Sequence, residues 1–117
     1  MKVTLSDALA RITTHWDPHV VADYDGHDVM VVKFAGAFPM HAHPAADDFF
    51  LVLKGEMVME LEDGDDVPLS AGDLYVVPRG VRHRPRADAE CEVLLIEPKG
   101  EPNTGDSGAP AASKPRL

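Results

Sequence analysis

The stretch from residue 41 to residue 55 reads HAHPAADDFFLVLKG. In an extended chain residues i and i+2 point to the same face, so His41 and His43 can direct both imidazoles at one point. A turn at residues 44–46 follows, and Asp48 then opens the apolar segment 49–53. A carboxylate entering that strand can face back toward the two imidazoles. The adjacent Asp47 should point to the opposite face, which favours Asp48.

A second stretch, residues 72–83, reads GDLYVVPRGVRH and ends on His83 after a Pro-Arg-Gly turn. Three imidazoles and one carboxylate can hold one divalent transition metal ion and leave coordination positions open. The candidate metals are Zn, Fe, Mn, Ni, Co and Cu. The candidate metal ligands are His41, His43, Asp48 and His83, and spacing alone leaves open the alternative that the histidines are exposed or structural.

The remainder of the chain shows the pattern of an all-β protein. Short segments rich in Val, Leu and aromatic residues are separated by Gly, Pro or Asp, which predicts an antiparallel sandwich or barrel. A tight turn at 25–27 predicts a hairpin between the first two strands. The only helical spacing is at residues 5–13. The expected strands are 19–24, 28–34, 49–53, 56–62, 67–69, 74–77, 81–86 and 92–97.

The order and spacing of these residues resemble the two motifs of the cupin superfamily. The first motif corresponds to Gly36 through Gly55 and the second to Gly72 through His83. Three positions depart from the pattern: Asp48 replaces the usual glutamate, one residue is missing before His41, and Ala87 replaces an asparagine. The resemblance is nearest to small single-domain cupins of the mannose-6-phosphate isomerase-like, RmlC-like group, which share the sequence NTGD at 103–106. It implies a double-stranded β-helix (jelly-roll) barrel, metal binding and a homodimer.

Three segments are expected: an N-terminal helical segment at 1–18 packed on the barrel, the barrel at 19–98, and a flexible extension at 99–117. The extension is rich in Gly and Pro and has few residues to bury.

Charge and composition exclude several classes of partner. Acidic residues outnumber basic ones by 20 to 11, and the net charge of −9 would repel nucleic acid and anionic membranes. No apolar run approaches the roughly 18 residues of a membrane span. Cys91 is the only cysteine, so no internal disulfide can form. The start of the chain lacks a signal-peptide pattern, and a cytoplasmic location is expected.

Side chains alternate between the two faces of a strand, so counting along each strand from the predicted ligands shows which residues should point into the barrel. Arg82, Arg84 and Arg86 should then point outward, where surface acids can pair with them. The apolar residues 49, 51 and 53 lie on the outer face and need a cover: the helix, another sheet or a second subunit. The expected lining of a ligand pocket is Phe50, Val52, Met57, Met59, Tyr75 and Val81.

Two functions remain open from the sequence. The first is a metal-dependent enzyme of oxygenase, isomerase or lyase type acting on a small molecule, with Tyr75 as a candidate proton donor and no identifiable general base. The second is a non-catalytic module that binds a small ligand or a structural metal. The predicted lumen contains no lysine or arginine, which argues against a sugar phosphate as substrate.

Overall fold

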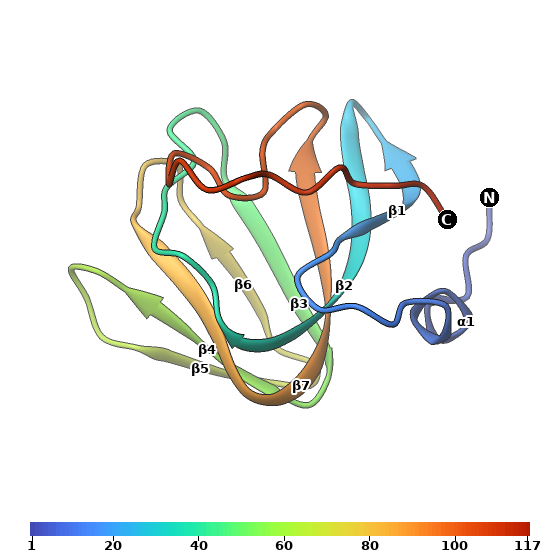
Figure 1. Ribbon diagram of the computed structural model, residues 1–117, viewed down its shortest axis with the longest axis horizontal. Coiled ribbons are helices and arrows are strands. Elements are labelled where there is room, and N and C mark those ends of the chain that lie inside the picture. Colours follow the sequence, from blue (N-terminus) through green and yellow to red (C-terminus); the bar gives the residue numbers. More distant parts are fainter.

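The computed structural model describes residues 1–117 as one short helix and seven strands (Figure 1). Five strands form a path in the order β1-β2-β7-β3-β6, and β4 joins β7 and β5 beside it. Every pairing is antiparallel. The predicted all-β class is confirmed. The elements are α1 (Leu5–Ala10), β1 (His19–Tyr24), β2 (His27–Ala37), β3 (Asp48–Lys54), β4 (Glu56–Leu61), β5 (Val67–Ser70), β6 (Leu74–Val77) and β7 (His83–Pro98).

The hairpin between β1 and β2 forms where the turn sequence predicted it. The two strands pair up to Tyr24 and His27, which leaves Asp25 and Gly26 as the loop. Both loop residues have positive φ, 50° and 78°, as the type I′ turn of a two-residue hairpin requires.

The prediction of separate strands at 81–86 and 92–97 was wrong, because β7 is one strand of 16 residues. Its first part pairs with β4, and its last part lies between β2 and β3. No Gly or Pro interrupts residues 87–91, so the chain can bend from one set of partners to the other without a break. Figure 1 shows β7 curving round the lower edge of the barrel.

Alternating side chains fill the barrel. Phe50 and Val52 on β3 are buried, and so are Met57 and Met59 on β4. They belong to one core cluster of 14 buried residues. A second cluster lies outside the barrel, where α1 packs on residues of β1 and β2 and on Leu53. The helix thus covers part of the outer apolar face. No helix in the structure has both the length and the apolar character that crossing a membrane requires.

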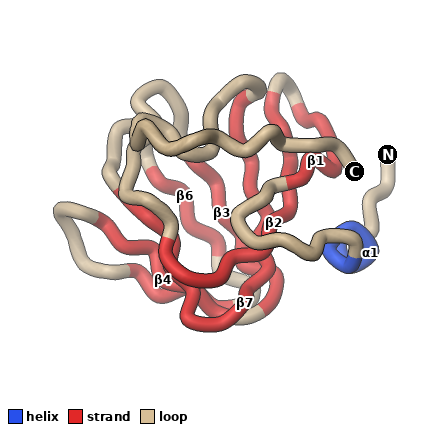
Figure 2. The backbone as a smooth tube through the Cα atoms, in the orientation of Figure 1, coloured by secondary structure: helices blue, strands red, loops and turns tan.

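The C-terminal segment, residues 99–117, lies across the front of the barrel (red in Figure 1; a loop in Figure 2). Near its end it runs beside β1: the Val20 amide donates to the Pro115 carbonyl (2.8 Å), and the Leu117 amide donates to the Val20 carbonyl (2.9 Å). Arg116 pairs with Asp23 at 2.6 Å. Composition alone had not suggested these contacts.

The single thiol should be inert in the folded protein. Cys91 is fully buried, and burial raises the pKa of its thiol to about 11. Because the thiolate is the reactive form, alkylation by iodoacetamide at pH 8 is expected to be at least about 100-fold slower than for a free cysteine. Mass spectrometry of timed samples measures this rate. Equal rates for the native protein and for protein in guanidinium chloride would contradict the buried position.

Candidate metal centre

Backbone pairing brings the two histidine motifs together. His41 lies in the link between β2 and β3, and His83 is the first residue of β7. The His41 amide donates to the His83 carbonyl at 2.9 Å, and the His83 amide donates back to the His41 carbonyl at 2.8 Å. Asp48 begins β3, so three separate stretches of chain meet at this place.

The four predicted ligands form one buried cluster. Their candidate ligand atoms all lie within 4.8 Å of one another. The His43 Nε2 atom is 3.2 Å from the His41 Nε2 atom and 3.2 Å from the Asp48 Oδ2 atom. The neighbouring Asp47 points outward and accepts a hydrogen bond from the Arg79 amide. Asp48 is therefore the carboxylate that faces the imidazoles.

All three rings present the same nitrogen to the centre of the cluster. The Nδ1 atom of His41 faces the Pro39 carbonyl at 2.8 Å, and the Nδ1 atom of His83 faces the Val81 carbonyl at 2.9 Å. The Nδ1 atom of His43 faces a carboxylate oxygen of Glu101 at 2.9 Å. Each acceptor oxygen selects the tautomer with the proton on Nδ1, which leaves the Nε2 lone pair free to bind a metal.

This donor set fits a divalent cation. When all three imidazoles are neutral, three Nε2 lone pairs and one carboxylate converge on one point. Two buried atoms of the cluster, the Asp48 Oδ1 atom and the His83 Nε2 atom, have no hydrogen-bond partner. Unpartnered buried polar atoms are rare in folded proteins and call for an ion or water. Imidazole and carboxylate ligands are those of the first-row transition metals.

The protonation states of the metal-free protein differ between neighbouring groups. Burial lowers the pKa of His41 to about 4. Burial opposes the charged form of His43 too, but hydrogen bonds to Asp48 and Glu101 outweigh it and raise its pKa to about 9. Burial also acts against the Asp48 carboxylate, yet the neighbouring imidazoles hold its pKa below the usual value. Burial and the nearby Asp48 raise the pKa of Glu97 to about 8.

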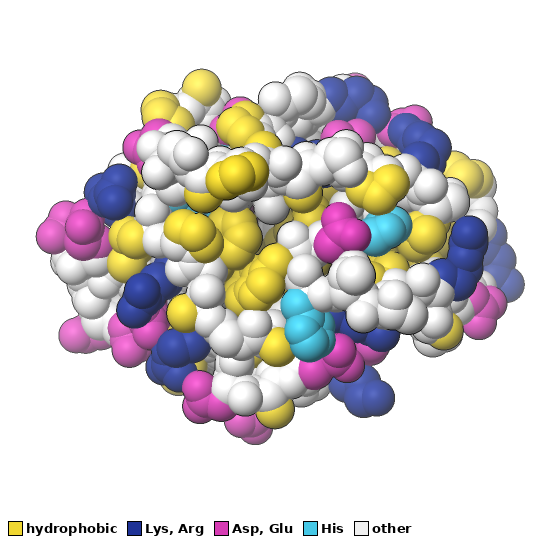
Figure 3. All heavy atoms as spheres, in the orientation of Figure 1, with side chains coloured by type: hydrophobic (Ala, Val, Ile, Leu, Met, Phe, Trp, Pro, Cys, Tyr) yellow, Lys and Arg dark blue, Asp and Glu magenta, His cyan; other side chains and the backbone are white.

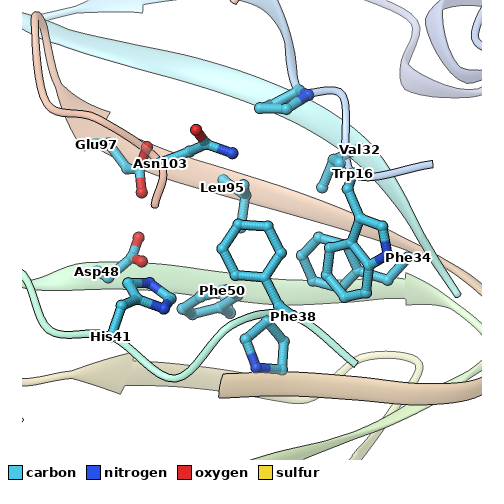
Figure 4. Close-up of a pocket in the computed structure, with 12 residues that line it drawn as sticks. Trp16, Val32, Phe34, Phe38, His41, Asp48, Phe50, Leu95, Glu97 and Asn103 are labelled. Atoms are coloured by element: carbon cyan, nitrogen blue, oxygen red, sulfur yellow. The ribbon is translucent and has the colours of Figure 1, made fainter. Parts of the chain in front are cut away.

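A small cavity adjoins the cluster (Figure 4). Polar groups of His41, Asp48, Glu97 and Asn103 lie toward one end, and aromatic rings lie toward the other. It offers about 30 Å³ for the centres of water molecules, room for a few waters or a very small ligand. Its lining contains no lysine or arginine, and consists of Trp16, Pro18, Val32, Phe34, Phe38, His41, Asp48, Phe50, Pro85, Leu95, Glu97 and Asn103.

The sequence-predicted pocket residues are distributed differently. Phe50 lines the cavity, whereas Val52, Met57 and Met59 are part of the buried core. Tyr75 and Val81 are partly buried and pack against that core without lining the cavity.

The sequence analysis did not assign Glu97 and Trp16 to the cavity wall. Strand parity could have found Glu97, because Cys91, Val93 and Leu95 alternate with it on the buried face of β7. No comparable signal pointed to Trp16, which lies outside every strand and stacks on Phe34 with ring centroids 4.3 Å apart.

The arginine row lies outside the barrel, as parity predicted. Arg84 and Arg86 both bind the carboxylate of Glu60, and Arg82 pairs with Glu62 at 2.7 Å. Figure 3 shows hydrophobic side chains in the middle of the face seen in Figure 1 and charged side chains around its edge.

Comparison with known proteins identifies the family. A family model described as the cupin domain matches residues 28–97, more than half of the chain. The chain belongs to the cupin superfamily, and the resemblance of its two motifs to those of that superfamily is confirmed.

Three similar proteins illustrate the range of the family. The uncharacterized protein YdbB of Bacillus subtilis is 32% identical over 79 residues, which cover 68% of this chain and 70% of that protein. The 3-hydroxyanthranilate 3,4-dioxygenase of Ruegeria pomeroyi is 37% identical over 83 residues. That match covers 65% of this chain and 46% of the dioxygenase, so the chain spans about half the length of that relative. The crystal structure of a cupin-2 domain containing protein from Shewanella frigidimarina superposes with a TM-score of 0.81 at 34% identity, covering 83% of this chain and 94% of that one.

Proposed function

We propose that this cupin is a metal-dependent dioxygenase for a small hydroxylated aromatic compound, with iron(II) held by His41, His43, Asp48 and His83. The observation that carries the proposal is the inward-facing set of three Nε2 lone pairs and one carboxylate beside an aromatic cavity. Iron held by imidazole and carboxylate ligands with open positions supplies the chemistry of dioxygen activation. The similarity to 3-hydroxyanthranilate 3,4-dioxygenase supports this choice of reaction.

The cavity favours a planar, uncharged ring over a phosphorylated substrate. Trp16, Phe34 and Phe38 present aromatic surfaces, and no cationic side chain is available to hold a phosphate. Glu97 and Asn103 lie at the polar end of the cavity, where a substrate hydroxyl can form hydrogen bonds. Because the cavity is small, binding of an aromatic ring requires side chains in its wall to move apart.

Oxygen consumption tests the proposed function directly. Protein loaded with iron(II) under nitrogen is mixed with oxygenated buffer and a panel of catechols, hydroquinones and aminophenols. We expect one of these classes to cause oxygen uptake that matches its own loss, since both oxygen atoms enter the product and no external reductant is needed. Mass spectrometry should then detect a product 32 Da heavier when both atoms are retained.

The matched control is the His41→Ala variant treated with iron in the same way, which should take up no oxygen. Failure of the iron-loaded wild type to consume oxygen with any member of the panel would contradict the dioxygenase proposal. Metal binding without such activity would instead support the non-catalytic module.

We also propose that a second copy of the chain covers the remaining outer face of the sheet. Leu74 and Val76 on the edge strand β6 are 52% and 42% exposed. They lie opposite Leu51 and Phe49 of β3, and α1 covers a different part of this face. Exposed apolar surface next to an unpaired strand edge is typical of a subunit interface.

The Leu74→Asp variant should therefore be monomeric at concentrations where the wild type is a dimer, because a charge would be buried without a partner. Light scattering coupled to size exclusion measures the mass. Tyr24→Asp is the control, since Tyr24 is exposed at the end of β1, away from β6. A monomeric wild type would show that this face has no second copy on it.

A further inference from the structure

We propose that Glu101 is a positioning residue for the metal ligand His43, and that residues 101–106 form a C-terminal clamp on the His41–His43 segment. This inference rests on the proposed metal site. The clamp lies beyond residue 97, where the match to the cupin domain ends.

The three ligand histidines are not held in the same way. His41 and His83 each place Nδ1 against the backbone carbonyl two residues earlier, so local chain geometry fixes their rings. His43 is different, because its Nδ1 partner is a side-chain carboxylate 58 residues further along the chain. Glu101 is therefore the only side chain that selects the Nδ1–H tautomer of a ligand in this cluster.

A carboxylate does more for a ligand imidazole than a carbonyl does. A charged acceptor forms a shorter and stronger hydrogen bond with Nδ1–H, and the bond increases the basicity of the opposite nitrogen. Glu101 can thus hold the ring plane of His43 and strengthen its Nε2 atom as a donor to the metal. It need not contact the metal to do so.

Glu101 is itself anchored to the barrel. Its amide donates to the Pro98 carbonyl at 3.1 Å, in the turn that ends β7. Lys114 donates to the backbone carbonyl of Glu101 and also binds Glu97 at 3.0 Å. The Glu101 side chain is only 19% exposed. The backbone of Glu101 is therefore held by two hydrogen bonds, one to Pro98 and one from Lys114, while its carboxylate contacts His43.

The other end of the clamp holds Ala42, the residue between the two ligands. The Asp106 amide donates to the Ala42 carbonyl at 3.0 Å, and the Ala42 amide donates to the Asp106 carboxylate at 2.8 Å. Gly105 has a positive φ of 54°, and a Cβ there would collide with the Ala42 carbonyl and lie 2.9 Å from a ring carbon of His41. Only glycine permits this approach of the two segments.

Zinc affinity tests the positioning role in the full chain. Competition with a chromophoric chelator gives the dissociation constant for wild type, Glu101→Ala and Glu101→Gln. We expect Glu101→Ala to bind zinc about 10–100-fold more weakly, as loss of an outer-shell partner does in other metal sites. Glu101→Gln should lose less, because its amide oxygen still accepts from Nδ1–H. Glu56→Gln, an exposed glutamate on β4, should match the wild type.

A second measurement separates positioning from a merely structural role. In 15N-histidine spectra of the zinc-loaded protein, His43 should show Nδ1 protonated and Nε2 bound to metal, and in Glu101→Ala this signal should broaden or change. Each variant loses or weakens the contact of Glu101 with His43 in the metal-free protein as well, so its melting temperature without metal is measured alongside to separate lost stability from lost positioning. If Glu101→Ala does not fold, Glu101→Gln still decides the question through its affinity and its spectrum.

The outcomes distinguish the two proposals. If wild-type protein binds neither zinc nor any other transition metal, the proposed function fails. If wild type binds zinc and both Glu101 variants bind it equally tightly with unchanged His43 signals, the metal site stands and the positioning role of Glu101 is overturned.

Discussion

The His83→Ala variant is expected to bind metal at least about 100-fold more weakly than wild type, a larger loss than outer-shell substitutions produce. His83 supplies one of the three Nε2 atoms of the cluster, and that atom has no other partner in the protein. Elemental mass spectrometry should find about one transition metal ion per wild-type chain and almost none in the variant. Chelator competition then gives the ratio of the two affinities.

His15→Ala is the matched control, because His15 lies outside the cluster and pairs with Glu90 at the surface. Its metal content should equal that of wild type. Circular dichroism establishes that His83→Ala is folded. Equal metal content in the His83 and His15 variants would show that the ion, if present, binds elsewhere on the chain.

Replacing Met59 with alanine should reduce the free energy of unfolding by about 2–5 kcal/mol. Met59 is completely buried in the core cluster, so alanine leaves a cavity that neighbouring side chains fill only in part. Urea denaturation followed by tryptophan fluorescence measures the change, since Trp16 is the only tryptophan and stacks on Phe34 inside the fold.

The Met59→Ala variant also tests whether Met59 contributes to core packing or to ligand binding. Met40→Ala is the comparison, because Met40 is only half-buried in the link before His41 and should cause a smaller loss of stability. Metal affinity of folded Met59→Ala should equal that of wild type. A variant as stable as wild type would be incompatible with the packing of Met59 in the core.

Residue spacing, together with the resemblance to the two cupin motifs, predicted the candidate metal site. The i and i+2 rule placed His41 and His43 on one face, and the parity of β3 placed Asp48 and not Asp47 beside them. These predictions depend on the twofold periodicity of extended backbone, which holds over a few residues whatever the rest of the fold does. The hairpin turn at Asp25 and Gly26 was predictable for the same reason, since its geometry depends on two residues.

The course of β7 shows where local patterns stop being informative. Nothing between Arg86 and Glu92 breaks a strand, but a long strand is stable only if other strands pair with it along its length. Its partners are far from it in sequence: β4 pairs with residues 83–86, β3 with residues 92–96, and β2 with most of the strand from Arg86 to Pro98. The pairing, and not the composition of residues 87–91, makes the strand continuous.

The amino-acid sequence by itself indicated the all-β class from strand periodicity and, through the order and spacing of two motifs that resemble those of cupins, the barrel and the four residues of the candidate metal centre. Only the tertiary structure decided what surrounds that centre. Glu101 reaches His43 across 58 residues, and Trp16 closes the cavity from outside the strands. Contacts of this kind depend on where the whole chain folds back on itself, and no periodicity in the sequence records them.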